Sequence, residues 1–354
     1  MSHPDSGSHP VARRRAQRGW SQAELAQRAG IPRTTISAIE GERLTPSVTA
    51  ALALARALEC SVEELFAGGA VLPQSSGPEW AWRPRSEPCR FWEAEVGGRR
   101  WLYPVESLAL NAILHDGVWR GGVEHEAKAD VAEQTLVMAC CDPAAGLLAA
   151  EYAQASGFRL LVFPRCGGLA LDLLKRGVIH VAGLHRSTGE HPNLNLETVR
   201  ERLGGGYRLL RAARWEEGVA LPADDRTRAA GALLRQPHRW ALREPGSAAR
   251  ECLDEWSGHR RLPGRVVDAH QAVAQAVRAG WASAGVCVKL AAEEAGLNFL
   301  PLRAEALDFC FAEALGRDPR GQALIRLLRS RAYRRLVSEL PGYDARETGE
   351  MLTA

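Results

Sequence analysis

Between residues 135 and 185, short apolar runs alternate with longer segments of helical periodicity, and this alternation restricts the fold more than any other feature. Three runs predict buried strands: TLVMACC (135–141), FRLLVFP (158–164) and VIHVAGLH (178–185). The segments between them predict helices, one with Pro143 at its first position and one that opens at Gly167-Gly168. Strand–helix–strand–helix–strand is the pattern of a parallel sheet with crossover helices.

The same alternation recurs in the second half of the chain. Three further runs predict a second sheet: RWALRE (239–244), SAGVCV (283–288) and NFLPL (298–302). Helical patterns over 246–257 and 268–279 lie between these runs. We therefore expect two α/β lobes, with the chain crossing between them near residues 210–222 and again near 305–311.

The first 67 residues have a different pattern, which predicts an all-α domain of five short helices. Ser21 and Glu24 form a capping box that opens one helix, and Gly30 ends it. Pro32 begins the next short helix. Two short helices separated by such a turn are typical of a helix-turn-helix. The other three helices are expected near residues 10–18, 47–58 and 61–67.

A Gly-, Pro- and Ser-rich stretch, GGAVLPQSSGPEWAWRPRSEP, separates the two patterns. We therefore divide the chain into a domain over 1–67, a linker over 68–90 and a domain over 91–354. Tryptophans concentrate in and after this linker, and we interpret them as packing residues.

Several classes of protein are disfavoured by composition and pattern. No apolar run approaches the roughly 18 residues that a membrane span needs, and the polar first residues lack the apolar core of a signal peptide. The eight scattered cysteines and the histidines show no metal-ligand spacing. No nucleophile elbow, phosphate-binding loop or catalytic carboxylate pair stands out. We expect a cytoplasmic protein that is not an enzyme and has no metal, no catalytic residue and no cofactor.

The stretch LREPGSAAR places an arginine on each side of a predicted helix start. Arg243 ends a strand, Ser247 precedes the helix and Arg250 lies one turn into it. The free N–H groups at a helix start, together with two guanidiniums, could bind an anion. The alternative is a serine N-cap flanked by two solvated arginines, and these residues alone do not decide between the two.

Two loops in the first lobe also fall at the carboxyl ends of predicted strands, where open α/β sheets bind small ligands. These loops place five residues in a predicted ligand site: Cys141, Asp142, Cys166, Gly167 and Gly168. The adjacent Cys140 and Cys141 could instead act as a thiol sensor or simply pack in the core.

Residues 9–67 resemble the Xre or Cro type of helix-turn-helix regulator. The stretches that carry the resemblance are QAELAQRAG and IPRTTISAIEGERLTPS. The resemblance implies that the second helix of the motif enters the major groove of an operator in double-stranded DNA. Because one such helix reads only a few base pairs, we expect a homodimer on a pseudo-palindromic operator. The residues it places against DNA are Arg33, Thr34, Thr35 and Ser37 on that helix, with Gln22 and Arg43 at phosphates or nearby base edges.

Most of residues 135–311 resemble periplasmic-binding-protein-like domains. The resemblance is carried by CGGLALDLLKRGVIHVAGLH, RWEEGVALP, LREPGSAARECLDE and HQAVAQAVRAGWASAGVCVKLAAEEAGLNFLPL. It is greatest to the version attached to helix-turn-helix regulators and to molybdopterin-transferase-type proteins. The resemblance implies a small anion between the lobes, with His185 in contact with it. Leu242, Ala248 and Cys166 depart from the residues usual in that family.

Together the two halves predict a ligand-responsive transcriptional regulator. Its effector would be a small molecule or oxyanion, with molybdate, tungstate or a molybdenum-cofactor-related compound suggested by the resemblance. The alternatives are a transport-associated or cytoplasmic substrate-binding protein, or a molybdenum-cofactor biosynthesis protein, in which the helix-turn-helix is secondary.

Overall fold

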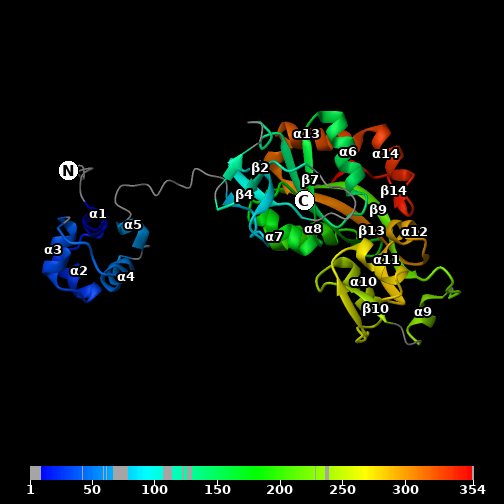
Figure 1. The fold of residues 1–354 in the computed structure, drawn as a ribbon, viewed down its shortest axis with the longest axis horizontal. Coiled ribbons are helices and arrows are strands. Elements are labelled where there is room, and N and C mark those ends of the chain that lie inside the picture. Colours follow the sequence, from blue (N-terminus) through cyan, green and yellow to red (C-terminus); the bar gives the residue numbers. More distant parts are fainter. Residues whose placement is uncertain are drawn as a thin grey trace. The chain divides into compact units, whose positions relative to one another are not determined.

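The chain forms two compact units, Met1–Gly77 and Pro78–Ala354 (Figure 1). The computed structural model describes residues 9–41, 43–58, 60, 62–66, 79–106, 114–121, 123–125, 130–227, 229–235 and 239–352. Within these ranges no helix combines the length and the apolar character that crossing a bilayer requires.

The first unit is helical, as predicted. Its five described helices are α1 (Pro10–Gln17), α2 (Gln22–Ala29), α3 (Arg33–Glu40), α4 (Val48–Ala57) and α5 (Val62–Phe66). The capping box of α2 is present: the Ser21 hydroxyl accepts from the Glu24 N–H, and the Glu24 carboxylate accepts from the Ser21 N–H. Gly30 ends α2 with φ of 65°, in the left-handed region. Pro32 is the N-cap of α3 and lies just before it.

The second unit begins with a small sheet. Its strands are β1 (Glu79–Trp80), β2 (Cys89–Val96), β3 (Arg99–Pro104), β4 (Gly117–Trp119) and β5 (Val123–His125), in the order β1-β3-β2-β4-β5. Residues 79–90, which the sequence assigns to the linker, therefore form β1 and the start of β2. Trp80 lies edge-on to Phe91 and Trp119, at ring-centroid distances of 6.2 and 5.7 Å. These tryptophans pack within the unit.

The larger sheet has ten strands in the described residues. They are β6 (Thr135–Cys140), β7 (Arg159–Pro164), β8 (Val181–Thr188), β9 (Tyr207–Leu221), β10 (Trp240–Arg243), β11 (Gly264–Val267), β12 (Ala284–Val288), β13 (Asn298–Ala312), β14 (Tyr343–Asp344) and β15 (Met351–Leu352). The main order is β11-β10-β12-β9-β13-β8-β6-β7. β6 runs parallel to β7 and β8, as predicted.

Two long antiparallel strands, β9 and β13, are the expected crossings between the lobes. β13 pairs with β8 of the first lobe, and β9 pairs with β12 of the second. The strands that the sequence assigns to a second sheet therefore belong to the same continuous sheet.

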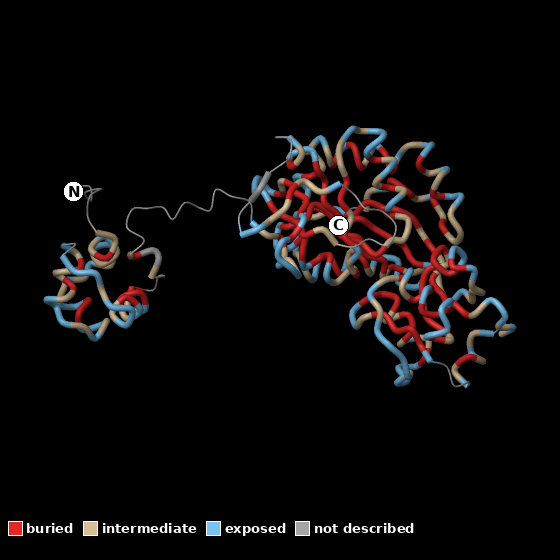
Figure 2. Tube along the Cα trace, in the orientation of Figure 1, coloured by how far each residue is buried: buried red, intermediate tan, exposed pale blue. Residues whose placement is uncertain are grey.

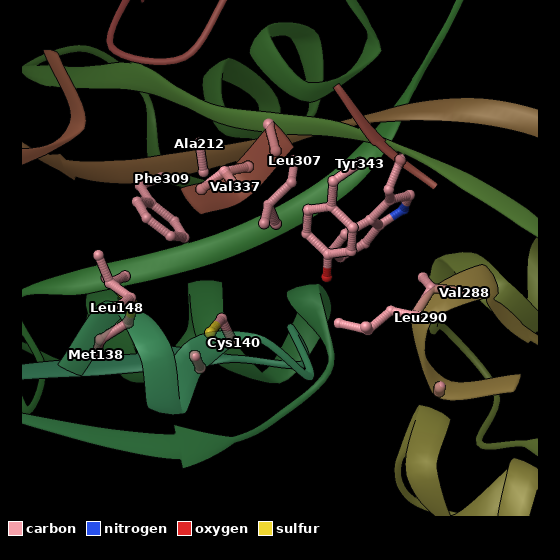
Figure 3. Packing of buried hydrophobic residues seen from close by; sticks show 14 of the residues in the cluster. Met138, Cys140, Leu148, Ala212, Val288, Leu290, Leu307, Phe309, Val337 and Tyr343 are labelled. Atoms are coloured by element: carbon pink, nitrogen blue, oxygen red, sulfur yellow. The ribbon is translucent and has the colours of Figure 1, made fainter. Parts of the chain in front are cut away.

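Helices cover both faces of this sheet. They are α6 (Ala145–Ser156), α7 (Gly167–Lys175), α8 (Leu194–Leu203), α9 (Ala230–Leu233), α10 (Ala248–Trp256), α11 (His270–Arg278), α12 (Lys289–Glu294), α13 (Pro319–Arg329) and α14 (Arg331–Ser338). Buried residues gather in the interior of this unit (Figure 2), and β6 is buried along its whole length. Met138 and Cys140 pack with Leu148 of α6 and Phe309 of β13 (Figure 3), whereas Ala139 belongs to the cluster with α7 and the small sheet.

Two details of the first lobe differ from the sequence prediction. Pro143 is not the first residue of α6, because Asp142 and Ala144 form a turn there and the helix begins at Ala145. β8 does not end at His185 but starts later and continues to Thr188. Pairing with β13 extends it beyond the apolar run that the sequence shows, so His185 lies within the strand.

Asn195 holds the backbone around His185 in place and is 1% exposed. Its side-chain oxygen accepts from the N–H groups of Arg186 (2.6 Å) and Ser187 (3.1 Å). Its amide nitrogen donates to the Ala306 carbonyl (2.8 Å) and to the Asp308 carboxylate (2.7 Å). One side chain thus joins α8, β8 and β13 beside the site described below.

We predict that Asn195→Ala lowers the free energy of unfolding by about 3 kcal/mol, because it leaves several buried polar groups without partners. Asn193→Ala is the matched control: Asn193 is exposed, its side chain makes no capping bond, and its replacement should cost less than about 0.5 kcal/mol. Urea denaturation of both variants tests this. Equal losses would contradict the role given to Asn195.

Candidate ligand site and DNA-binding surface

The predicted DNA contacts lie on the accessible side of α3. Ile36 and Ile39 are buried against the other helices of the first unit. Arg33 and Thr34 are exposed, and Thr35 and Ser37 are half-buried. The apolar residues of α3 therefore pack inward, and its short polar residues remain accessible. A helix that binds in a DNA groove requires this arrangement.

Glu40, at the end of α3, links three helices of this unit. It accepts from the Arg15 guanidinium at 2.7 and 2.9 Å and from the Gln22 amide at 2.9 Å. Arg15 also donates to the Trp20 carbonyl. Arg15 is thus engaged in holding α1 against α3, and the Gln22 amide nitrogen is already hydrogen-bonded. Arg43, the remaining predicted contact, is exposed after α3.

In the second unit, a cavity of about 330 Å³ lies where the two lobes meet. Gly167 and Gly168 at the start of α7 line it from the first lobe, and Gly246, before α10, lines it from the second. A Cβ atom on Gly168 would lie 3.6 Å from the Gly246 carbonyl oxygen. The two predicted helix starts therefore face one cavity, which His185 also lines.

One ion pair connects the lobes beside this cavity: Arg186 of β8 donates to Glu251 of α10 at 2.9 Å. A second pair, in which Arg303 of β13 donates to Glu255 at 2.6 Å, holds α10 against the crossing strand. Each pair is partly exposed, so its contribution to stability is modest.

Arg243, at the end of β10, is 2% exposed. Its Nε and Nη2 atoms donate to the Glu244 carboxylate at 2.8 and 3.0 Å, and Nη2 also lies 3.3 Å from the Asp268 carbonyl. Its Nη1 atom is buried and has no hydrogen-bond partner among the described residues. A guanidinium in this position has donor capacity left for a ligand.

Ser247 and Arg250 have local partners. The Ser247 hydroxyl accepts from the Arg250 N–H and donates to the Glu244 carbonyl, so it is an N-cap. The Arg250 guanidinium pairs with Asp254 of the same helix at 2.9 and 3.0 Å. Arg250 Nη1 also lies 3.5 Å from the Arg243 backbone carbonyl. The N-cap interpretation thus describes Ser247, and the Arg250 side chain bonds to its own helix and to the Arg243 backbone.

His185 lies between a thiol and a carboxylate. Its Nε2 atom is 3.1 Å from Cys141 Sγ, and its Nδ1 atom is 2.5 Å from Glu305 Oε2. Arg303 and Trp215 also donate to Glu305. Burial disfavours the charged ring, but the negative charges of Cys141 and Glu305 outweigh it and raise the pKa of His185 well above its ordinary value.

Two residues of this cluster were not predicted as ligand-site residues from the sequence. Glu217 of β9 and His270 at the start of α11 are both completely buried. Glu217 Oε2 lies 3.9 Å from His185 Nδ1, and Glu217 Oε1 lies 3.8 Å from His270 Nδ1. Among the described residues neither Glu217 oxygen nor His270 Nε2 has a hydrogen-bond partner. In the sequence, Glu217 stands among the charged and apolar residues of YRLLRAARWEEGVAL, where no periodic pattern marks it as buried.

Burial and neighbouring charges determine the protonation of these two groups. Burial, together with the charge of Glu305, raises the pKa of Glu217 well above its usual range. Burial and the positive charges of Arg243 and His185 lower the pKa of His270 well below its usual value. Both shifts favour the uncharged form of the group in this arrangement.

The other predicted residues of the first lobe lie around the same region. Asp142 is half-buried and accepts from the Tyr343 hydroxyl at 2.5 Å. Cys166 is buried at the N-cap of α7 and makes no capping hydrogen bond. Cys140 packs in the core (Figure 3), so the two adjacent cysteines have different surroundings.

Comparisons with known proteins agree with this architecture. A "Helix-turn-helix" family model matches residues 11–65, and a "PBP superfamily domain" model matches residues 149–329, just over half of the chain. The chain is 32% identical over 127 residues to the "Uncharacterized protein YvgK" of Bacillus subtilis (strain 168). That alignment covers 34% of this chain and 41% of the relative's length.

Similar solved structures include an ABC-type phosphate transport receptor from Vibrio cholerae, with 14% identity and a TM-score of 0.43. It covers 59% of this chain and 99% of that chain. The effector binding domain of QuiR, in complex with shikimate, has 10% identity and a TM-score of 0.40, and covers 54% of this chain and 92% of that chain. On the match over residues 149–329, the chain belongs to the family of PBP superfamily domains, here preceded by a helix-turn-helix.

Proposed function

We propose that this protein is a cytoplasmic, ligand-responsive transcriptional regulator whose second unit binds a small anion between its lobes. The observation that carries the ligand proposal is the Arg243 guanidinium, which is buried with its Nη1 atom lacking a partner. A buried donor of this kind costs free energy unless a ligand satisfies it. The helix-turn-helix supports a role at DNA.

The surroundings of Arg243 limit the size and charge of the anion. Glu217 is buried nearby and the cavity between the lobes is only about 330 Å³, so the site does not accommodate a large polyanion. A compact oxyanion held by Arg243 and by the start of α7 fits the donors present. Molybdate, tungstate or a molybdenum-cofactor-related anion are the candidates that the family resemblance suggests.

Control of DNA binding requires the ligand to prefer one arrangement of the lobes over another. The Gly168–Gly246 approach and the Arg186–Glu251 pair belong to a closed arrangement, which a ligand touching both lobes favours. A coupling free energy of about 1–3 kcal/mol between anion binding and operator binding would change operator affinity 5- to 150-fold. We further propose that the regulator is a homodimer on a two-fold operator, because one α3 reads only a few base pairs.

We predict that Arg243→Ala weakens anion binding about 10- to 100-fold, the value of a buried charge-assisted hydrogen bond. Isothermal calorimetry with phosphate, sulfate, molybdate and tungstate on the full chain measures this. Arg243→Lys keeps the charge but loses the forked donors, and it provides a second variant if the alanine substitution does not fold.

Arg250→Ala is the matched control, because its guanidinium is paired with Asp254. It should lower anion affinity less than about threefold, in line with a partly exposed pair. An equal effect of both substitutions would place Arg250 in the site, as the sequence suggested. A millimolar dissociation constant corresponds to a binding free energy of only about 4 kcal/mol. Anion binding no tighter than this in the unmodified protein would contradict the proposal.

We also predict that Arg33→Ala costs roughly 1–3 kcal/mol of operator affinity and relaxes base preference, because arginine reads guanine with two hydrogen bonds. Arg56→Ala, an exposed arginine on α4, should leave base preference unchanged. Footprinting and competition binding with mutated operators measure both. An unaffected Arg33→Ala variant would contradict the assignment of α3 as the recognition helix.

A further inference from the structure

We propose that Cys141, His185 and His270 bind a divalent transition-metal ion, with zinc as the reference ion, in the interlobe site. Each residue offers one ligand atom, and the three atoms lie within 4.8 Å of one another. Thiolate and imidazole are the ligands that zinc and its neighbours in the first row prefer. The metal would act as a second effector of the proposed regulator. Metal binding itself does not depend on the proposed function, whereas an effect of the metal on operator binding does.

Each histidine faces a carboxylate with its Nδ1 atom. His185 Nδ1 lies 2.5 Å from Glu305 Oε2, and its Nε2 atom lies 3.1 Å from Cys141 Sγ. His270 Nδ1 lies 3.8 Å from Glu217 Oε1, and its buried Nε2 atom has no partner in the described part of the chain. A metal-binding histidine usually donates the N–H of its other ring nitrogen to a carboxylate, because this hydrogen bond fixes the proton on the nitrogen that does not bind the metal.

The unpartnered Glu217 carboxyl is an independent observation for a cation. It is completely buried, and neither oxygen has a hydrogen-bond partner among the described residues. Its Oε2 atom lies 3.9 Å from His185 Nδ1, and its Oε1 atom lies 3.8 Å from His270 Nδ1. A cation bound by these two histidines would therefore have an unpartnered carboxyl behind both rings.

Metal binding requires the proton between Cys141 Sγ and His185 Nε2 to leave for solvent, and it requires one local rearrangement at His270. In the structure described here, His270 Nδ1 accepts from the Val288 N–H at 3.3 Å, which leaves the ring proton on Nε2. A metal on Nε2 needs this proton on Nδ1, where the Glu217 carboxylate accepts it. Val288 then loses its acceptor. The metal-free and metal-bound forms therefore differ in the hydrogen bonds between α11 and the end of β12.

Three ligands leave a fourth coordination position open. Structural zinc sites are closed by four protein ligands, whereas sites with three protein ligands keep a position for water or another molecule. His185 also lines the 330 Å³ cavity, so this position lies where a small anion could reach it. The metal and the anion of the proposed function could therefore bind together.

The test is metal binding by the full-length protein after treatment with a chelator. We expect one equivalent of Zn²⁺ in competition with a chromophoric chelator. Co²⁺ should give the absorption of a four-coordinate ion together with a thiolate-to-cobalt charge-transfer band. Cys141→Ser should abolish this band, whereas Cys140→Ala, the matched control at the adjacent residue, should retain it with unchanged zinc affinity.

Glu305→Gln keeps the shape of the side chain but removes the charge behind His185, and it should weaken zinc about 10- to 100-fold. A purely structural role for Glu305 would leave the zinc affinity of the folded variant unchanged. Near-ultraviolet circular dichroism confirms that each variant is folded. Zinc below 0.1 equivalent, or affinity unchanged in both Cys141→Ser and His185→Gln, would overturn the metal site.

Operator titrations with and without Zn²⁺ separate the two proposals. A change in operator affinity that Cys141→Ser removes supports the metal as an effector. Zinc binding without any operator binding would contradict the proposed function and leave the metal site supported. Anion binding to the chelator-treated protein without zinc binding would overturn the metal site and leave the proposed function supported.

Discussion

Two completely buried carboxylates on neighbouring long strands, Glu217 and Glu305, determine the arrangement of the polar interior of the second unit. Glu305 is stabilised by Arg303, His185 and Trp215, and the charges of the first two lower its pKa despite burial. Glu217 has no hydrogen-bond partner among the described residues. Burial, together with the charge of Glu305, raises the pKa of Glu217 well above its usual range, so the two carboxyls differ in their preferred protonation.

Local patterns were sufficient to predict most of the fold. Strands buried on both faces, such as β6, have continuous apolar runs, and the capping box at Ser21 marks a helix start unambiguously. The small sheet had no such signal: β2 reads CRFWEAEV, with charged residues in a strand that is mostly buried. The end of β8 was missed for a related reason, because pairing with β13 rather than side-chain pattern extends it.

The candidate site was predictable only in part. The rule that ligands bind at strand ends and helix starts selected Cys141 after β6 and Arg243 at the end of β10, whereas His185 lies within β8 and lines the cavity. The rule could not select Glu217, because this residue lies within β9 and joins the cluster through strand pairing. His270 lies at the start of α11, where the rule applies, but it was not predicted as a ligand-site residue. Arg250 was predicted as a ligand residue, but the structure shows it paired with Asp254. The spacing of four residues between them was visible in the sequence, whereas only the side-chain geometry shows that this pair forms.

β9 and β13 each pass from one lobe to the other as a single strand, and the consequence is mechanical. No flexible linker joins the lobes along this path, so rotation of one lobe against the other has to bend or twist these two strands. The register of β13 against β9 shifts between Pro301 and Arg303 and between Leu307 and Asp308, on both sides of Glu305. The backbone that would flex therefore carries the carboxylates, and a ligand that changes their charge acts on the hinge itself.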